Sequence, residues 1–140
     1  MPRGSRAHNA SMVLLRFGTG IVFLWFGVAQ IRDPSFGMAY LPEVVYTIGN
    51  AINLANFDRI FVVAHGVFEL GLAAALIVGF FTRLAALLLA AQLFLIVVIV
   101  YILAGPEMAV RDFGVLVATL SIAINGPDRM AADNWGNRRS

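Results

Sequence analysis

Two ionisable side chains, His65 and Glu69, lie four residues apart inside a long apolar stretch of this 140-residue chain. Residues at i and i+4 share one face of a helix. An ionisable group in an apolar membrane helix costs free energy and is usually kept for function. A histidine and a carboxylate on one face can relay a proton or hydrogen-bond a carbonyl. A quinone head group requires both when it is reduced.

Further polar residues are expected close to this pair. Gln30 lies near the end of the first apolar stretch, and Arg111 and Asp112 open the last one. In an antiparallel bundle these ends share one side, the outer side, so all five side chains can converge there. With a rise of about 1.5 Å per residue, His65 lies roughly 7 Å and Glu69 roughly 13 Å below the outer boundary. Three further polar residues are expected to be structural and lie nearer the other end or the middle of the bundle: Arg16, Arg83 and Gln92.

A structural interpretation competes with the chemical one. His65, Glu69 and an arginine can satisfy one another and fix helix register. A metal site is not expected, because one buried histidine and one buried glutamate are fewer ligands than such sites use. Haem would depend on His65 alone, since His8 lies in the N-terminal tail. The chain has no cysteine, which excludes disulfides and thiolate chemistry, and no phosphate-binding or dinucleotide motif.

The elements that must position these residues are four apolar runs of about the 17–25 residues that cross a bilayer. They are Met12–Ile31, Ile60–Phe81, Leu84–Leu103 and Ala109–Asn125. The chain is 60% hydrophobic and 13% charged, with a mean hydropathy of +0.83. We therefore predict an all-α integral membrane four-helix bundle over residues 12–126, between a cytoplasmic N-terminal tail (1–11) and a cytoplasmic C-terminal tail (127–140).

Arginine placement predicts the topology, because the chain has no lysine. With the N-terminus in the cytoplasm, the inner side carries Arg3, Arg6, Arg83, Arg129, Arg138 and Arg139. The outer side carries fewer: Arg32, Arg59 and Arg111. The positive-inside rule then favours cytoplasmic termini. The first run is expected to be a retained helix, because it is too long for the core of a signal peptide. The net charge of +2, with its scattered arginines, gives no indication of nucleic-acid binding.

The connections between the runs are unequal. Thr82 and Arg83 are nearly all that joins the second and third runs, which predicts a tight antiparallel hairpin. The segment Arg32–Arg59 carries apolar residues at helical spacing, namely Leu41, Val45, Ile48 and Ile52, with Pro42 and Glu43 where a helix would start. That spacing predicts a short amphipathic helix on the outer surface; an irregular loop is the alternative. Small residues at helical spacing indicate close helix packing: Gly20, Gly27, Gly66, Gly71, Gly114 and Ala118.

An ordered set of residues resembles a known family. In chain order it comprises Arg16, Gly20, Phe23, Gly27, Gln30, Glu69-Leu70-Gly71-Leu72, Gly79-Phe80-Phe81-Thr82-Arg83-Leu84-Ala85-Ala86, Arg111-Asp112, Asn125-Gly126-Pro127-Asp128-Arg129 and Asp133. The set is similar to the DoxX family of small four-helix bacterial and archaeal membrane proteins. The resemblance implies a plasma-membrane location and either quinone-linked redox chemistry or a membrane-anchor role. Founding relatives are associated with a thiosulfate:quinone oxidoreductase, and others with redox complexes that handle oxidative stress.

The resemblance carries the family's polar positions onto Arg16, Glu69, Arg83, Arg111 and Asp112. One position departs from the family, where lysine is frequent and this chain has Gln30. The missing cation makes thiosulfate or another oxyanion a less suitable substrate.

Three functions remain open at this point. The first is an accessory subunit of a membrane redox or respiratory complex, contacting quinone through the outer polar residues. The second is a stand-alone quinone-linked oxidoreductase component, with electrons from a partner because no redox cofactor site is evident. The third is a carrier of small lipophilic molecules. Larger membrane subunits are the expected partners besides the bilayer.

Overall fold

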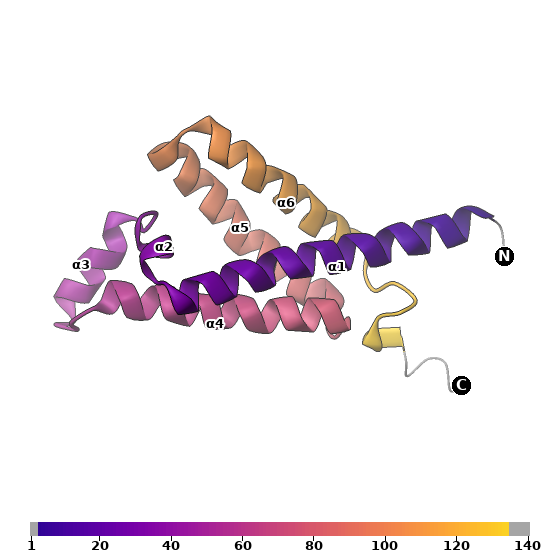
Figure 1. The fold of residues 1–140 in the computed structure, drawn as a ribbon, viewed down its shortest axis with the longest axis horizontal. Helices are drawn as coiled ribbons and strands as arrows, with labels where there is room; N and C mark the ends of the chain where they lie inside the picture. Colours follow the sequence, from indigo (N-terminus) through magenta and orange to yellow (C-terminus); the bar gives the residue numbers. More distant parts are fainter. Residues whose placement is uncertain (1–2, 135–140) are drawn as a thin grey trace.

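The computed structural model describes residues 3–134, and the regular elements in that range are all helices. They follow in the order α1 (Arg3–Arg32), α2 (Ser35–Met38), α3 (Glu43–Ala51), α4 (Phe57–Val78), α5 (Thr82–Ala104), α6 (Pro106–Asn125) and the short 3₁₀ helix η1 (Ala132–Asn134). The expected all-helical class is confirmed. Figure 1 shows the arrangement, with the turn between α4 and α5 at one end, here the inner end, and α2 and α3 at the other, the outer end.

The long helices form two pairs. Helix α1 packs along α4, and α5 packs along α6. The two pairs meet near the inner end and diverge toward the outer end (Figure 1). The short turn between the second and third long helices is present. The prediction that these two helices, α4 and α5, pack tightly as an antiparallel hairpin is wrong. The reason is local: Gly79 and Phe81 both adopt left-handed backbone conformations, so α5 starts in a direction that leads away from α4.

Two glycines bring α1 and α4 together. A Cβ added at Gly27 would lie 2.9 Å from the carbonyl oxygen of Gly66, and one added at Gly66 would lie 3.0 Å from that of Gly27. Only glycine permits backbones this close. The packing role expected of the glycines therefore holds at Gly27 and Gly66. It is wrong at Gly71 and Gly114, where an added Cβ would meet nothing within 4 Å.

The core is small and the outside is apolar. A buried cluster joins all four long helices through Phe23, Leu76, Leu89 and Ile122. Many large apolar side chains stay on the outer surface, as in a protein solvated by lipid. Within the described range, three helices are long and apolar enough to cross a membrane: α1, α4 and α5. Helix α6, the fourth expected span, is not among them, and it carries Glu107, Arg111 and Asp112.

The segments outside the long helices are more ordered than expected. The amphipathic helix after Pro42 is confirmed as α3, with Val45 buried, and α2 is an additional short helix that the sequence pattern did not reveal. The expected N-terminal tail is helical from Arg3, because α1 extends beyond its apolar part. Residues 127–134 of the expected C-terminal tail pack against the inner end through the hydrogen bonds given below; residues 135–140 lie outside the described part.

Candidate functional site

The outer half encloses a cavity of about 330 Å³ between the two helix pairs. Its wall is mostly aromatic and aliphatic, with side chains from α1, α4, α5, α6 and the α2–α3 segment. Phe61 and Leu95 line it and are also exposed on the outside, so the apolar wall continues into the outer surface. The cavity lining includes every polar residue that the sequence placed in the outer half, and two more, Tyr40 and Gln92; the five expected residues are Gln30, His65, Glu69, Arg111 and Asp112.

Four of these side chains form a hydrogen-bonded chain, here called the outer network: Gln30, His65, Glu69 and Gln92. Gln30 Nε2 donates to Glu69 Oε2 at 2.7 Å, and Gln92 Nε2 lies 3.4 Å from Glu69 Oε1. His65 Nδ1 lies 2.8 Å from Gln30 Oε1. Because the Gln30 amide donates to Glu69, its oxygen accepts, and His65 Nδ1 carries the hydrogen. The Glu69 carboxylate thus accepts from two amides while its residue is only 3% exposed.

One atom of the outer network has no partner. Among the described side chains, Gln92 Oε1 is the buried nitrogen or oxygen that lacks a hydrogen bond. A buried polar atom left in this way costs free energy unless a ligand or water satisfies it. The sequence pattern put Gln92 among structural residues, whereas the structure places it in the cavity wall beside Glu69.

The close approach of α1 and α4 explains why the network forms. Gln30 follows Gly27 by three residues on α1 and lies opposite Gly66 of α4, and Glu69 follows Gly66 by three residues, about one turn farther along α4. An added Cβ at Gly66 would lie 3.0 Å from Gln30 Cβ, which shows how near Gln30 lies to α4. The α2–α3 segment closes the outer end. An added Cβ at Gly37 would lie 2.8 Å from Val62, so α2 rests directly on α4.

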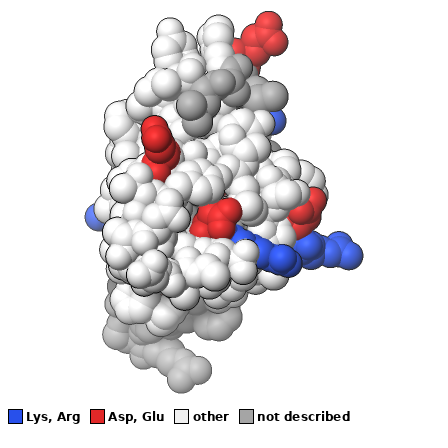
Figure 2. Space-filling model, turned by 90° about the vertical axis from the view of Figure 1, so that its left-hand side faces the viewer, with Lys and Arg blue, Asp and Glu red and all other residues white. Residues whose placement is uncertain are grey.

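Arg111 and Asp112 lie at the rim and do not join the outer network. Arg111 Nε lies 2.8 Å from Asp112 Oδ1, and the two side chains are 63% and 11% exposed. Arg111 therefore forms an ion pair with Asp112 close to the cavity and does not pair with Glu69. The outer end, seen face-on in Figure 2, is largely uncharged, with one area where basic and acidic side chains adjoin.

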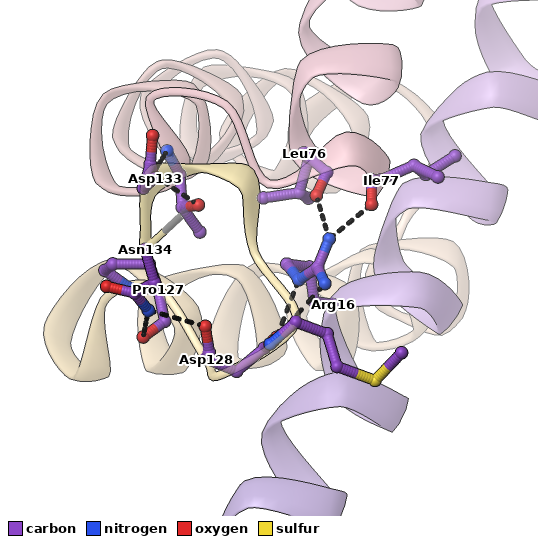
Figure 3. Close-up of polar contacts among 9 residues, drawn as sticks. Arg16, Leu76, Ile77, Pro127, Asp128, Asp133 and Asn134 are labelled. Carbon is purple, nitrogen blue, oxygen red and sulfur yellow. Dashed lines mark hydrogen bonds and ion pairs between the residues drawn. The ribbon is translucent and has the colours of Figure 1, made fainter. Parts of the chain in front are cut away.

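A second polar cluster, the inner lock, consists of Arg16, Leu76, Ile77 and Asp128 (Figure 3). Arg16 Nε donates to Asp128 Oδ2 at 2.7 Å, and both side chains are almost fully buried. Arg16 Nη1 donates to the carbonyl oxygens of Leu76, at 2.9 Å, and Ile77. These carbonyls belong to the last turn of α4, where a cation is favoured by the free acceptors and the helix dipole.

The segment after α6 also holds the start of α5. Asp133 accepts hydrogen bonds from the backbone N–H groups of Phe81 and Thr82 and from the Thr82 hydroxyl, each at 2.8 Å. Desolvation raises the pKa of Asp133, although the residue is exposed, but these hydrogen bonds and the nearby Arg16 outweigh it, so its pKa lies below the ordinary value. Asp128 and Asp133 were visible in the sequence, yet their partners lie 112 and 51 or 52 residues away.

The remaining predicted polar residue, Arg83, lies at the inner end near Gly126. A Cβ added at Gly126, whose φ is +79°, would lie 2.5 Å from Arg83 Nε, so the arginine packs over this glycine. Within residues 3–134, no group of three histidine, aspartate or glutamate side chains is arranged to hold a metal ion.

Comparison with known proteins gives one match. The family model DoxX matches residues 11–102, which include most of α1, all of α4 and nearly all of α5. No curated protein and no solved structure matches the chain.

Proposed function

The chain belongs to the DoxX family, and on that premise we propose that it is a membrane subunit whose outer cavity binds the head group of a quinone-type carrier. The electrons come from a partner subunit of a redox or respiratory complex. The bundle crosses the plasma membrane of a bacterium or archaeon four times, with α6 as the fourth span and both termini in the cytoplasm.

One observation carries this proposal: the outer network lines a largely apolar cavity. A flat ring needs apolar walls, and the cavity supplies Phe23, Phe26 and Ile96. Ring oxygens need polar partners, and Gln30, Gln92 and His65 offer amide and imidazole groups. Its 330 Å³ lies in the range of small-ligand sites. The exposed cavity residues Phe61 and Leu95 suit a ligand whose tail stays in lipid.

The residues fit proton exchange better than electron transfer. A quinone becomes a quinol by taking two electrons and two protons. In the proposal the partner supplies the electrons. His65 and Glu69 are one helical turn apart and joined through Gln30, so together they can hold and pass a proton beside the ring.

Glu69→Gln tests the proposal. The variant keeps the shape of the side chain and one acceptor oxygen but removes the ionisable group. We expect it to assemble with its partners, to retain bound lipid, and to lose most quinone-dependent turnover, by about 10²-fold or more. Turnover is measured in native membranes as quinol formation. Glu107→Gln is the matched control, because it makes the same change on an exposed carboxylate outside the cavity.

Wild-type turnover in Glu69→Gln would contradict a role in proton exchange. Mass spectrometry of lipids co-purified from the native membrane tests binding separately. A purified bundle without quinone, and without redox subunits, would contradict the proposal as a whole.

A second candidate is a carrier of small lipophilic molecules. The continuity between the cavity wall and the outer surface at Phe61 and Leu95 favours it. Such a carrier would move its ligand at the same rate in oxidising and reducing conditions, and Glu69→Gln would have little effect on it.

A further inference from the structure

The outer network offers a ligand hydrogen-bond acceptors rather than donors. Both amide nitrogens that face Glu69 are engaged, Gln30 Nε2 at 2.7 Å and Gln92 Nε2 at 3.4 Å. Gln30 Oε1 is engaged by His65. The buried atom left over is an acceptor, Gln92 Oε1. With the hydrogen on Nδ1, the Nε2 atom of neutral His65 is an acceptor as well.

We infer that the cavity selects the reduced, hydroxyl-bearing form of its ring ligand, and that Gln92 sets this selectivity. A ring hydroxyl donates to Gln92 Oε1 and satisfies the buried acceptor. A carbonyl in the same place has no hydrogen to donate, so the Gln92 oxygen would stay unpaired against another oxygen. A site with a buried group that only one ligand can satisfy rejects the other strongly. This inference rests on the proposed quinone function and specifies which redox form is bound.

Because the site binds the reduced ring more tightly than the oxidised ring, it favours the reduction of a quinone bound there. The partner supplies two electrons, as in the proposed function, and two protons reach the ring oxygens through His65 and the Gln30–Glu69 pair.

Three forms of one ring test this on the purified full chain in detergent: a short-chain benzoquinone, its hydroquinone, and the hydroquinone dimethyl ether. The ether keeps both oxygens but donates no hydrogen bond. Affinities are measured anaerobically by calorimetry for the wild type and for Gln92→Met, which keeps the length of the side chain without the amide. Thermal unfolding checks that the variant is folded.

We expect the wild type to bind the hydroquinone about tenfold more tightly than the quinone or the ether, as one buried hydrogen bond would give. In Gln92→Met the three affinities should converge, mainly through weaker hydroquinone binding. Equal wild-type affinities for the three would overturn the inference and leave the proposed function standing, and this arm needs no variant. An unchanged preference in folded Gln92→Met would overturn the role of Gln92. Binding of none of the three would overturn both the inference and the proposed function.

Discussion

Arg16 and Glu69 are both charged residues buried in the bundle, 1% and 3% exposed, but their surroundings differ. Arg16 lies in the inner lock, where its guanidinium donates hydrogen bonds to a carboxylate and to two carbonyl oxygens at a helix end. Glu69 lies beside a cavity, where one of its two amide contacts is long, at 3.4 Å, and the donor amide leaves its own oxygen unpaired.

The difference separates two uses of buried polarity. The inner lock joins segments remote in the chain: α1, the end of α4 and the segment after α6 (Figure 3). Its groups are satisfied by the protein itself, as expected for a cluster that fixes helix positions. The outer network also joins α1, α4 and α5, but it leaves room and an unsatisfied acceptor, as expected where a ligand completes the hydrogen bonding.

Removing the carboxylate of the inner lock should have the largest effect on stability. Asp128→Ala leaves the Arg16 guanidinium buried without its counter-ion. Breaking a buried ion pair from one side costs about 3–5 kcal/mol. We expect this loss in the free energy of unfolding, measured by denaturation in detergent. The double variant Arg16→Met/Asp128→Leu should be less destabilised than Asp128→Ala, since no charge stays unpaired. A loss below about 1 kcal/mol in Asp128→Ala would show that the lock is not stabilising.

The helix crossing that supports the outer network should give the next largest effect. In Gly27→Ala the new Cβ would lie 2.9 Å from the Gly66 carbonyl oxygen, a backbone atom that cannot move without separating α1 from α4. We expect a loss of about 1–3 kcal/mol of stability. Ligand affinity of the cavity should also fall, because Gln30 moves away from His65 and Glu69.

Gly71→Ala is the matched control for this crossing. Its added Cβ meets nothing within 4 Å, and alanine favours a helix interior over glycine by up to about 1 kcal/mol. Thermal unfolding should therefore show a neutral or slightly stabilising change. Equal losses in Gly27→Ala and Gly71→Ala would rule out the close crossing.

These two regions were predicted from the sequence to different degrees. The convergence of Gln30, His65 and Glu69 followed from helix ends and i, i+4 spacing, and the structure brings them together. To predict that Gln92 reaches the cavity, one would need the distance between the two helix pairs. That distance depends on the left-handed turn at Gly79 and Phe81. Phe81 carries no local signal for that conformation, because glycine is the residue that normally adopts it.

The inner lock was hidden for a different reason. Arg16 was recognised as a polar residue near the inner end and Asp128 only as part of the set that resembles the family, and their contact spans 112 residues of chain. A polar segment after the last helix resembles a loose tail in composition, and only tertiary contacts order it. The packed η1 segment was therefore missed, whereas α3, whose pattern is local, was predicted with nearly correct ends.

Acid should weaken the inner end through Asp133, by a smaller amount. Its pKa is lower in the folded chain than in the unfolded one, so its stabilisation is present above the unfolded pKa and is lost as the pH falls through the folded pKa. The expected window lies below about pH 4. Loss of this cap on α5 should cost about 1 kcal/mol. Unfolding midpoints measured from neutral pH downward should fall less steeply in Asp133→Asn. A slope unchanged by that substitution would contradict the cap.

The smallest effect is expected at the rim of the cavity. The ion pair there has nearly the same length as the pair of the inner lock but is more exposed, so comparing the two shows the effect of burial alone. The Arg111–Asp112 pair joins Nε and Oδ at 2.8 Å, and the Arg16–Asp128 pair at 2.7 Å. The side chains of the rim pair are 63% and 11% exposed, against 2% and 1% in the inner lock. Water and salt screen an exposed pair, so Arg111→Ala should cost about 0–1 kcal/mol in thermal unfolding. That cost should shrink further in about 1 M salt, where the screening length is about 3 Å, whereas the cost of Asp128→Ala should persist. If both variants lost stability equally, burial would not be what separates the two clusters.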